Sequence, residues 1–303
     1  TSLSSEMTEF GPRNFANLGM NQGWNIGTRW VADVGFERSK LLNTQPLSQP
    51  DEQVPLASGS LAGDFSSAFF GLGYRGKDWT VSTRTQWRNS ATEDRRALIG
   101  GFYREPQAGH GFSAELNLID RTTASAIAGF DGRLRLGWAR RPDGSRWIIY
   151  NRADWGASRQ RGAGLSSATR RFVNLLNAHF RPNVRQELAV HHALKYVRSD
   201  FDDFRAAGIV NLLGIDWRRR LNSRFDFGLH ASWYKANSLD VLDSGFGIDF
   251  AFVVAQNMRM HVGYNLTGFE DEDFRSARYT AQGPFVRFSL KLDQASLRDI
   301  LRR

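Results

Sequence analysis

The sequence contains no cysteine, and this absence excludes disulfide scaffolds, thiolate metal sites and cysteine nucleophiles. Long apolar runs are also missing. The longest, at 250–255, has six residues, whereas a membrane-spanning helix needs about 20, so a helical membrane span is excluded. No signal peptide is visible at Thr1, which favours a mature product or an excised domain.

Lysine is scarce, and the positive charge comes mostly from arginine. The net charge is +9, and among 40 basic residues the only lysines are Lys40, Lys77, Lys195, Lys235 and Lys291. In nucleic-acid-binding proteins the cations gather on one face or arm, whereas these arginines are spread along the whole chain. We therefore expect no nucleic-acid partner. A basic pore lining, or contacts with the phosphates of lipopolysaccharide, explains the charge equally well.

Aromatic residues are plentiful at 13%, although the mean hydropathy is only −0.44. This combination fits strands that are apolar on one side only. Alternation over four to eight residues is typical of a strand with two different faces. In the segment 79–88, Trp79, Val81, Thr83, Thr85 and Trp87 alternate with Thr80, Ser82, Arg84, Gln86 and Arg88. The same period occurs at 112–121, 225–234, 246–252, 260–266 and 286–292.

Two kinds of link between these segments take turns along the chain. Short links are predicted at 76–78, 105–109, 142–144, 182–183, 221–223 and 256–257, and mostly longer polar links at 41–64, 89–94, 157–169, 199–203, 237–244 and 270–282. Short turns on one rim and longer loops on the other are typical of bacterial outer-membrane barrels, whereas a soluble sandwich has no reason to separate them. The segments between the links have roughly 9–12 residues, enough for a tilted strand to cross a bilayer.

The sequence thus predicts an all-β fold, a closed antiparallel transmembrane β-barrel of about 16 strands with short periplasmic turns and longer extracellular loops. Fourteen strands is the alternative. An even number brings both chain ends to the periplasm, so the segment 2–10 is the predicted first strand, with 11–13 as its hairpin. Closure removes the edges that an open sheet exposes to lipid. The nine tryptophans, mostly near strand ends, suit girdles at the membrane interfaces.

Charged residues occur on one side of many of these strands. Facing lipid at mid-depth, each Arg or Lys costs roughly 2–4 kcal/mol, so we predict that this side faces the lumen. Both signs occur, so ion pairs between strands can brace or fill the barrel, while an aqueous channel of mild anion preference is the functional alternative. The predicted lumen-lining residues are Asp33, Arg84, Arg88, Glu115, Arg133, Arg135, Arg152, Asp154, Lys195, Asp216, Arg218, Asp226, Asp249, Arg287 and Lys291.

Two segments near the C-terminus have a distinctive sequence, 262–274 (VGYNLTGFEDEDF) and 279–294 (YTAQGPFVRFSLKLDQ). Together with 17–24, 35–39 and 195–198, they resemble the C-terminal outer-membrane β-barrel domain of large repeat-bearing surface proteins of proteobacteria. The likeness covers most of the chain, with its specific motifs concentrated at the C-terminus. In that family the barrel usually ends a much longer polypeptide. The resemblance therefore implies a membrane anchor with an attached N-terminal repeat region.

The segment 283–292 also resembles the signal that barrel-assembly machinery recognises on a final strand. In that signal a polar residue and a glycine precede alternating apolar residues. The matching residues are Gly283, Val286, Phe288, Leu290 and Leu292. Such signals usually end at the chain terminus, whereas here 293–303 continue. We predict that 1–292 form the barrel and that 293–303 form a short periplasmic tail.

Three patterns invite chemistry that the sequence does not support. Residues 71–76 spell G-x-G-x-x-G, but the dinucleotide motif needs a helix that begins within it, and small residues on a crowded inner face or at a bend explain the glycines better. His191 and His192 would point to opposite faces of a strand, and His179, His191, His230 and His261 could all line the lumen without zinc-site spacing. The acidic run 270–273 fits a solvated loop better than a Ca²⁺ site.

The sequence predicts no enzyme, no catalytic site, no bound metal and no cofactor. The carboxylates Asp202, Asp203 and Asp240 have no histidine nearby in sequence, although distant partners across strands stay open. The predicted role is an integral barrel of the Gram-negative outer membrane that anchors or displays part of a larger cell-surface protein. A porin-type diffusion channel with an Arg-rich lumen is the first alternative, and an export pore for an attached or partner polypeptide is the second. Predicted partners are outer-membrane lipid, lipopolysaccharide and the barrel-assembly machinery.

Overall fold

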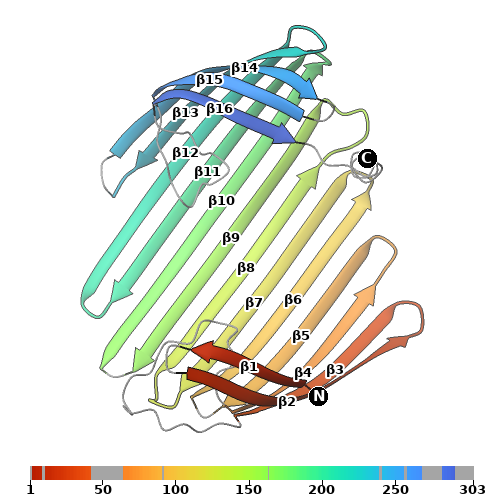
Figure 1. Ribbon diagram of the computed structural model, residues 1–303, viewed down its shortest axis with the longest axis vertical. Coiled ribbons are helices and arrows are strands. Elements are labelled where there is room, and N and C mark those ends of the chain that lie inside the picture. Colours follow the sequence, from red (N-terminus) through yellow and green to blue (C-terminus); the bar gives the residue numbers. More distant parts are fainter. Residues whose placement is uncertain are drawn as a thin grey trace.

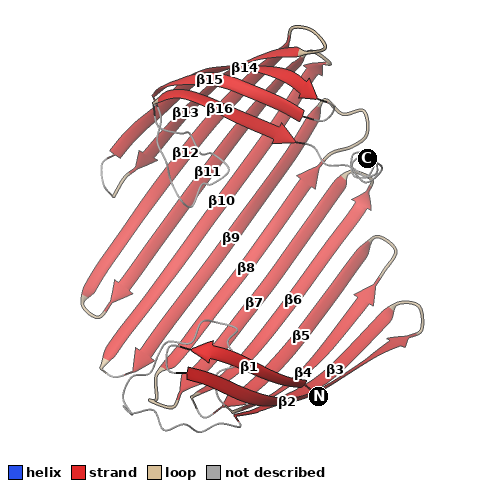
Figure 2. Cartoon of the chain, viewed as in Figure 1, coloured by secondary structure: helices blue, strands red, loops and turns tan. Residues whose placement is uncertain are grey.

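The computed structural model describes residues 2–8, 11–41, 64–90, 92–162, 164–238, 241–255, 258–267 and 282–290. These residues form one antiparallel sheet of sixteen strands, in which each strand pairs with its neighbour in the chain (Figures 1 and 2). The strands are β1 (Ser2–Thr8), β2 (Gly11–Ile26), β3 (Trp30–Leu41), β4 (Phe65–Arg75), β5 (Trp79–Ser90), β6 (Glu93–Gln107), β7 (His110–Thr123), β8 (Ala128–Arg140), β9 (Trp147–Gly162), β10 (Leu165–Asn183), β11 (Gln186–Phe201), β12 (Phe204–Arg220), β13 (Phe225–Ala236), β14 (Val241–Ala255), β15 (Met258–Thr267) and β16 (Gly283–Leu290). No helix in the described part is long and apolar enough to cross a membrane.

The two ends of the sheet curl forward in front of the middle strands. In Figure 1, β1 and β2 lie in front near the bottom, and β14 to β16 lie in front near the top. The strand order begins at β1 and ends at β16, and no pairing of described residues joins those two edges. The sheet of the described residues is therefore strongly curved but not closed, so the predicted closure is not confirmed. β1 and β16 are also the shortest strands, with 7 and 8 residues. A pairing between them would therefore contain few ladder hydrogen bonds.

The strand register separates two faces. Directly paired residues of antiparallel strands lie on the same face, and one such row crosses eight strands, from β3 to β10. The row consists of Asp33, Gly71, Arg84, Ile99, Asn117, Arg133, Gly156 and Arg171. We call the face that carries this row the charged face, and the opposite one the apolar face. All nine tryptophans lie on the apolar face, because each has the opposite parity in its strand.

The charged face is the concave one. Side chains there contact partners beyond the neighbouring strand: Arg218 of β12 reaches Asp249 of β14 at 3.0 Å, and the ring of His230 of β13 lies 6.2 Å from that of Phe285 of β16. On the apolar face, the aromatic pairs of the described residues join only adjacent strands, as in Trp155–Phe172. Convergent side chains on one face and divergent ones on the other are what a curved sheet produces.

The glycines fit this curvature. A Cβ added at Gly71 would lie 2.0 Å from Oδ1 of Asp33, and one added at Gly247 would lie 2.1 Å from Nε2 of His230. Both positions are on the charged face, where a larger residue would require the facing side chain of Asp33 or His230 to move. The structure therefore supports the interpretation of Gly71 as a small residue on a crowded inner face, whereas Gly73 has ordinary van der Waals space and Gly76 lies just after the strand β4.

The link lengths differ from the prediction. We call the edge with links 27–29, 76–78, 108–109, 141–146, 184–185 and 221–224 the turn rim, and the opposite edge the loop rim. The two longest links, 42–64 and 268–282, do belong to the loop rim, but the predicted longer loops at 89–94, 157–169 and 199–203 are links of only two residues, 91–92, 163–164 and 202–203. The predicted longer length was therefore wrong for these three links, although the two longest links lie on the rim where longer loops were predicted.

Most links of the loop rim are short because the strands continue into the segments predicted as loops. β10 has 19 residues and β12 has 17, well beyond the predicted strand length. Tight turns then suffice: Asp202 adopts a positive φ of 45°, and its carboxylate accepts a hydrogen bond of 2.8 Å from the backbone N–H of Ser166. The predicted hairpin 11–13 was also wrong, because Gly11 pairs with Thr8 and already belongs to β2.

Candidate functional site: the charged face

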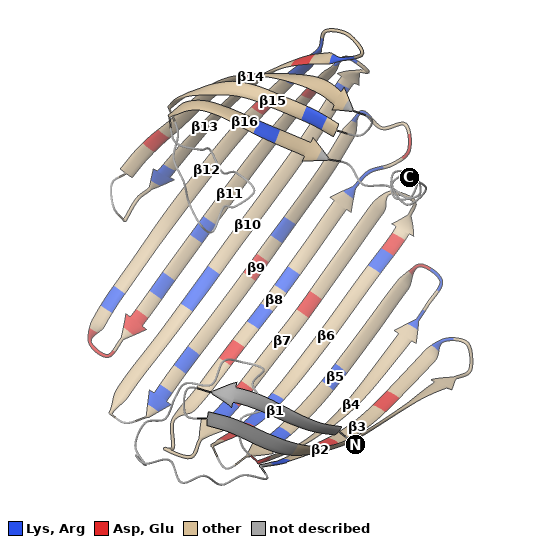
Figure 3. Ribbon diagram, viewed as in Figure 1, with Lys and Arg blue, Asp and Glu red and all other residues tan. Residues whose placement is uncertain are grey.

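Every predicted lumen-lining residue in the described part of the chain lies on the charged face. These residues are Asp33, Arg84, Arg88, Glu115, Arg133, Arg135, Arg152, Asp154, Lys195, Asp216, Arg218, Asp226, Asp249 and Arg287. Lys291 lies outside the described residues. Figure 3 shows positive and negative positions along the length of the middle strands rather than at their ends alone. Whether this face encloses a lumen depends on closure, which belongs to the proposal below.

A chain of ion pairs crosses the middle of this face. Arg135 of β8 contacts Glu115 of β7 at 2.9 Å and Asp154 of β9 at 2.8 Å. Arg152 reaches the other oxygen of Asp154 at 3.1 Å. Asp154 is largely buried, so two guanidinium groups neutralise one carboxylate at low exposure. Three neighbouring strands are thereby tied together by charge as well as by their backbone ladders.

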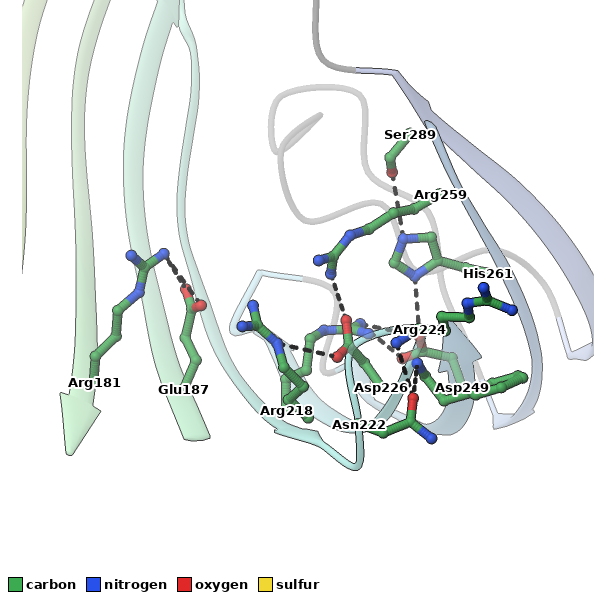
Figure 4. A network of polar contacts seen from close by, with 12 residues as sticks. Arg181, Glu187, Arg218, Asn222, Arg224, Asp226, Asp249, Arg259, His261 and Ser289 are labelled. Atoms are coloured by element: carbon green, nitrogen blue, oxygen red, sulfur yellow. Dashed lines mark hydrogen bonds and ion pairs between the residues drawn. The ribbon is translucent and has the colours of Figure 1, made fainter. Parts of the chain in front are cut away.

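A second network lies between β12 and β16, near the turn rim. Asp249 accepts contacts from Arg218 at 3.0 Å and from Nδ1 of His261 at 3.1 Å. Asp226 pairs with Arg259 and, at 3.7 Å, with Arg220. Figure 4 shows Arg218 of β12 and Arg259 and His261 of β15 directed towards the two carboxylates. The side chains of Asp226 and Asp249 are 8% and 7% exposed, the lowest values among the paired acids of the described residues.

Three of the predicted lumen arginines have aromatic neighbours instead of acidic ones. The guanidinium carbon of Arg84 lies 3.5 Å from the ring centre of Phe69, and that of Arg88 lies 4.0 Å from the ring centre of Phe65. Arg287 stacks more loosely on Phe285, at 5.6 Å. Cation–π contacts of this kind hold a guanidinium group over the face of an aromatic ring.

The histidines occupy the faces that the sequence predicts. His191 and His192 pair with Asn177 and Leu176, on opposite faces of the sheet. His191 contacts Asp216 at 3.1 Å, and His179 contacts Glu187 at 3.3 Å, both on the charged face. His230 and His261 also lie on that face, according to their register. Within the described residues, no group of three His, Asp or Glu side chains could hold a metal ion.

A recess of about 730 Å³ opens on the charged face at the turn rim. Its walls come from the 141–146 and 184–185 links and from the ends of β10 to β13 and β15. The charged residues that line it are Arg146, Arg181, Arg185, Arg218, Arg220, Arg259, Glu187 and Asp226. Of these, only Arg218 and Asp226 were predicted as lumen residues. Arg146 and Arg185 belong to turns, and the period-two pattern that marks inward residues gives no information in a turn.

The predicted assembly signal coincides with β16. The side chains of Val286 and Phe288 are on the apolar face and strongly exposed, at 60% and 58%. Gly283 begins the strand with a positive φ of 135°. Leu290 ends the strand, and Leu292 lies outside the described residues. Three other features named in the sequence also lie outside them, namely the 293–303 tail, Asp240 and the acidic run 270–273.

The apolar face exposes large hydrophobic side chains across most of the sheet. Members of this surface include Trp24, Phe36, Phe70, Trp87, Leu98, Phe112, Phe130, Leu136, Trp155, Leu213, Leu229, Phe246, Phe250 and Val262. Soluble monomers rarely expose a contiguous apolar patch larger than a few hundred Å². Charged residues on this face gather towards the strand ends, for example Arg104 near the turn rim and Arg170 near the loop rim. The molecule thus has an apolar band on its convex surface and charge on its concave one.

Comparisons with known proteins give no family. No family model matches the chain, and no curated protein matches it. Among solved structures, it is similar to a bacterial polysaccharide outer membrane secretin, with a TM-score of 0.39 and 8% identity over 83% of both chains. It is also similar to the unliganded ferric citrate transporter FecA, with a TM-score of 0.41 and 7% identity over 87% of this chain and 50% of that one. The anion-selective porin from Comamonas acidovorans gives a TM-score of 0.35 and 9% identity, covering 93% and 89%. At these scores the likenesses assign no function to this chain.

Proposed function

We propose that this chain is an integral β-barrel of the Gram-negative outer membrane whose role is to anchor a larger cell-surface protein. The observation that carries the proposal is the contrast between the two faces of one curved sheet. The convex face exposes large apolar side chains and carries all nine tryptophans, and the concave face carries the charges. A lipid bilayer stabilises this distribution, because a charged side chain at mid-depth is costly on the lipid-facing side and stable in a polar interior.

In the membrane, we propose, the edges β1 and β16 pair and close the barrel. An unpaired strand edge exposes backbone N–H and C=O groups, and each such group costs several kcal/mol in hydrocarbon. The chain order supports this closure, since sixteen strands in sequential antiparallel order place β1 and β16 in opposite directions. Both chain ends then lie on the turn rim, which we assign to the periplasm.

Anchoring is favoured over transport by the ion pairs that cross the charged face. Contacts such as Glu115–Arg135–Asp154 and Arg218–Asp249–His261 use side chains of both signs to brace the wall. The sequence likeness to anchor domains of repeat-bearing surface proteins points the same way. The second candidate is an anion-preferring channel, which the Arg-lined recess favours. No catalytic role is part of the proposal.

The partners are proposed from the same distribution of charge. On the apolar face near the loop rim, arginines of β9 to β12 occur above the Trp155–Phe172 pair. They are Arg159, Arg161, Arg170, Arg198 and Arg205. Lipopolysaccharide carries its phosphates near the outer surface of the membrane. In the proposed orientation these arginines would lie at the same depth. The exposed apolar alternation of β16 is the feature that we propose the barrel-assembly machinery recognises.

Cysteine labelling tests location and orientation, since the native chain has no cysteine. Asp203→Cys places a thiol in a loop-rim link, and Val184→Cys places one in a turn-rim link where the side chain is exposed. In intact Gram-negative cells that express the chain, we expect a membrane-impermeant maleimide to label Asp203→Cys only. Val184→Cys should become reactive once the outer membrane is permeabilised. The reverse pattern would contradict the orientation, and equal labelling of both in a soluble fraction would contradict the membrane location.

Single-channel recording in a planar bilayer separates the anchor from the channel. We expect refolded protein to show a gel mobility that depends on heating, a β-type circular dichroism spectrum and no stable stepwise currents, because the charged interior is braced by ion pairs. An absence of currents supports the anchor role only for protein that is shown to be inserted, for example by protection from protease. Stable currents with anion preference would overturn the anchor role in favour of the channel.

A further inference from the structure

We propose that the recess at the turn rim is a binding site for a small hydrophilic polyanion that carries at least two phosphate or carboxylate groups. This inference goes beyond the anchoring role and does not depend on whether the barrel conducts ions. It rests on the charge of the recess, its unpartnered donors, its size and the fixed backbone of its turns.

Positive charge is in excess in the recess. Six guanidinium groups line it and only two carboxylates, those of Glu187 and Asp226. Glu187 is paired with Arg181 at 3.2 Å, and Asp226 is shared by Arg220 and Arg259. The acids are therefore already engaged, and an excess of positive charge remains on a concave wall. A concave surface of one sign concentrates counter-ions.

Some of the donors have no partner in the protein. Within the described residues, the side chains of Arg146 and Arg185 make no ion pair or hydrogen bond. The Nη1 atom of Arg218 is buried and has no hydrogen-bond partner there, although Nη2 contacts both oxygens of Asp249. A buried donor without a partner costs about 1–3 kcal/mol. Arg218 is one of the residues that line the recess, and guanidinium forks bind phosphate and carboxylate in bidentate fashion.

The volume and the lining set the class of ligand. About 730 Å³ is much more than one phosphate needs and lies within the range of about 300–1,000 Å³ that is typical of small-molecule sites. Most of the residues that line the recess are polar or charged, with Pro182 and Val184 as the exceptions. Several anionic groups on a compact polar skeleton match the six arginines.

The two free arginines stand on fixed backbone. The carbonyl of Arg146 accepts a 2.8 Å hydrogen bond from the N–H of Arg181, and the carbonyl of Arg185 accepts one of 2.7 Å from the N–H of Arg220. The N–H of Arg185 in turn donates to Oδ1 of Asn183 at 2.9 Å. The backbone at both arginines is thus held by hydrogen bonds. Binding an anion therefore has to order only the two side chains, which limits its entropy cost.

Calorimetric titration of the full chain, refolded in detergent, tests the site with pyrophosphate as the probe. We expect one saturable site whose affinity falls as salt is added. Arg146→Ala/Arg185→Ala should weaken binding at least about tenfold, since it removes two charge-assisted donors. Propane-1,2,3-tricarboxylate, titrated in parallel, shows whether the site prefers phosphate or carboxylate. Sulfate and chloride should bind at least about tenfold more weakly than the preferred polyanion, because each occupies few of the donors.

The matched control is Arg95→Ala/Arg171→Ala. These two arginines also lie on the charged face and make no ion pair within the described residues, but they belong to the loop-rim halves of β6 and β10. This variant loses the same charge and should keep its affinity within about twofold, because only diffuse attraction changes. Absence of saturable binding to wild-type protein overturns the proposal, as does equal weakening in both double variants. A chain that inserts into membranes without binding overturns this inference alone, whereas failure to insert overturns the proposed function whatever the titration shows.

Discussion

Leu98→Arg should cost about 2–4 kcal/mol of folding free energy in a lipid bilayer, whereas Ile99→Arg should cost less than about 1 kcal/mol. The two residues are neighbours near the middle of β6 and are almost equally exposed, at 39% and 44%. Leu98 pairs with Thr85 and Leu118 on the apolar face, and Ile99 pairs with Arg84 and Asn117 on the charged face. Only a bilayer on one side and water on the other distinguishes these positions.

The measurement is equilibrium unfolding in urea of protein refolded into lipid vesicles, with both variants compared with the wild type. Residue type, exposure and strand position are nearly matched, so the pair is its own control. Ile99→Arg places a cation beside Arg84, which works against the expected difference, and screening by water in the interior keeps that repulsion small. Equal losses in the two variants would mean that both faces meet the same solvent, and the membrane assignment would then be wrong.

The two faces could be predicted from the sequence because their signal is local. A period of two needs no knowledge of strand pairing, and it placed residues as distant as Arg84 and Asp249 on the same face of the sheet. The tryptophans follow the same rule on the other face. Whether that alternation meant a closed barrel could not be decided locally, because closure depends on the pairing of two edges that are far apart in the chain.

The partners within the charged face could not be predicted. Arg135 lies between Glu115 and Asp154 only because the β7–β8 and β8–β9 links set that register. The sequence interpretation misjudged link lengths elsewhere, at 157–169 and 199–203, where polar residues continue the strands. The end of a strand that is polar on both faces resembles a loop in composition. The sequence therefore does not show where such a strand ends. The recess was missed for a related reason, since Arg146 and Arg185 lie in turns.

Asp249→Asn should destabilise the protein by about 2 kcal/mol, because removal of one partner from a buried ion pair leaves an uncompensated charge. Asp249 is 7% exposed and holds both Arg218 and His261, so the loss would affect β12, β14 and β15 together. We place the cost below the 3–5 kcal/mol typical of fully buried pairs, since Arg218 keeps about a third of its side-chain exposure, at 34%.

Asp131→Asn is the control for that variant. Asp131 pairs with Arg121 at a similar distance, 3.2 Å, but the two side chains are 43% and 45% exposed, so the pair should contribute less than about 1 kcal/mol. Unfolding in urea measures both variants, and Arg218→Met/Asp249→Asn completes a double-mutant cycle. We expect the double variant to lose less than the sum of its single variants, because the buried cation leaves together with its partner. If Asp249→Asn costs no more than Asp131→Asn, the network near the turn rim does not brace the barrel, and the structural argument for an anchor with a filled interior loses its main support.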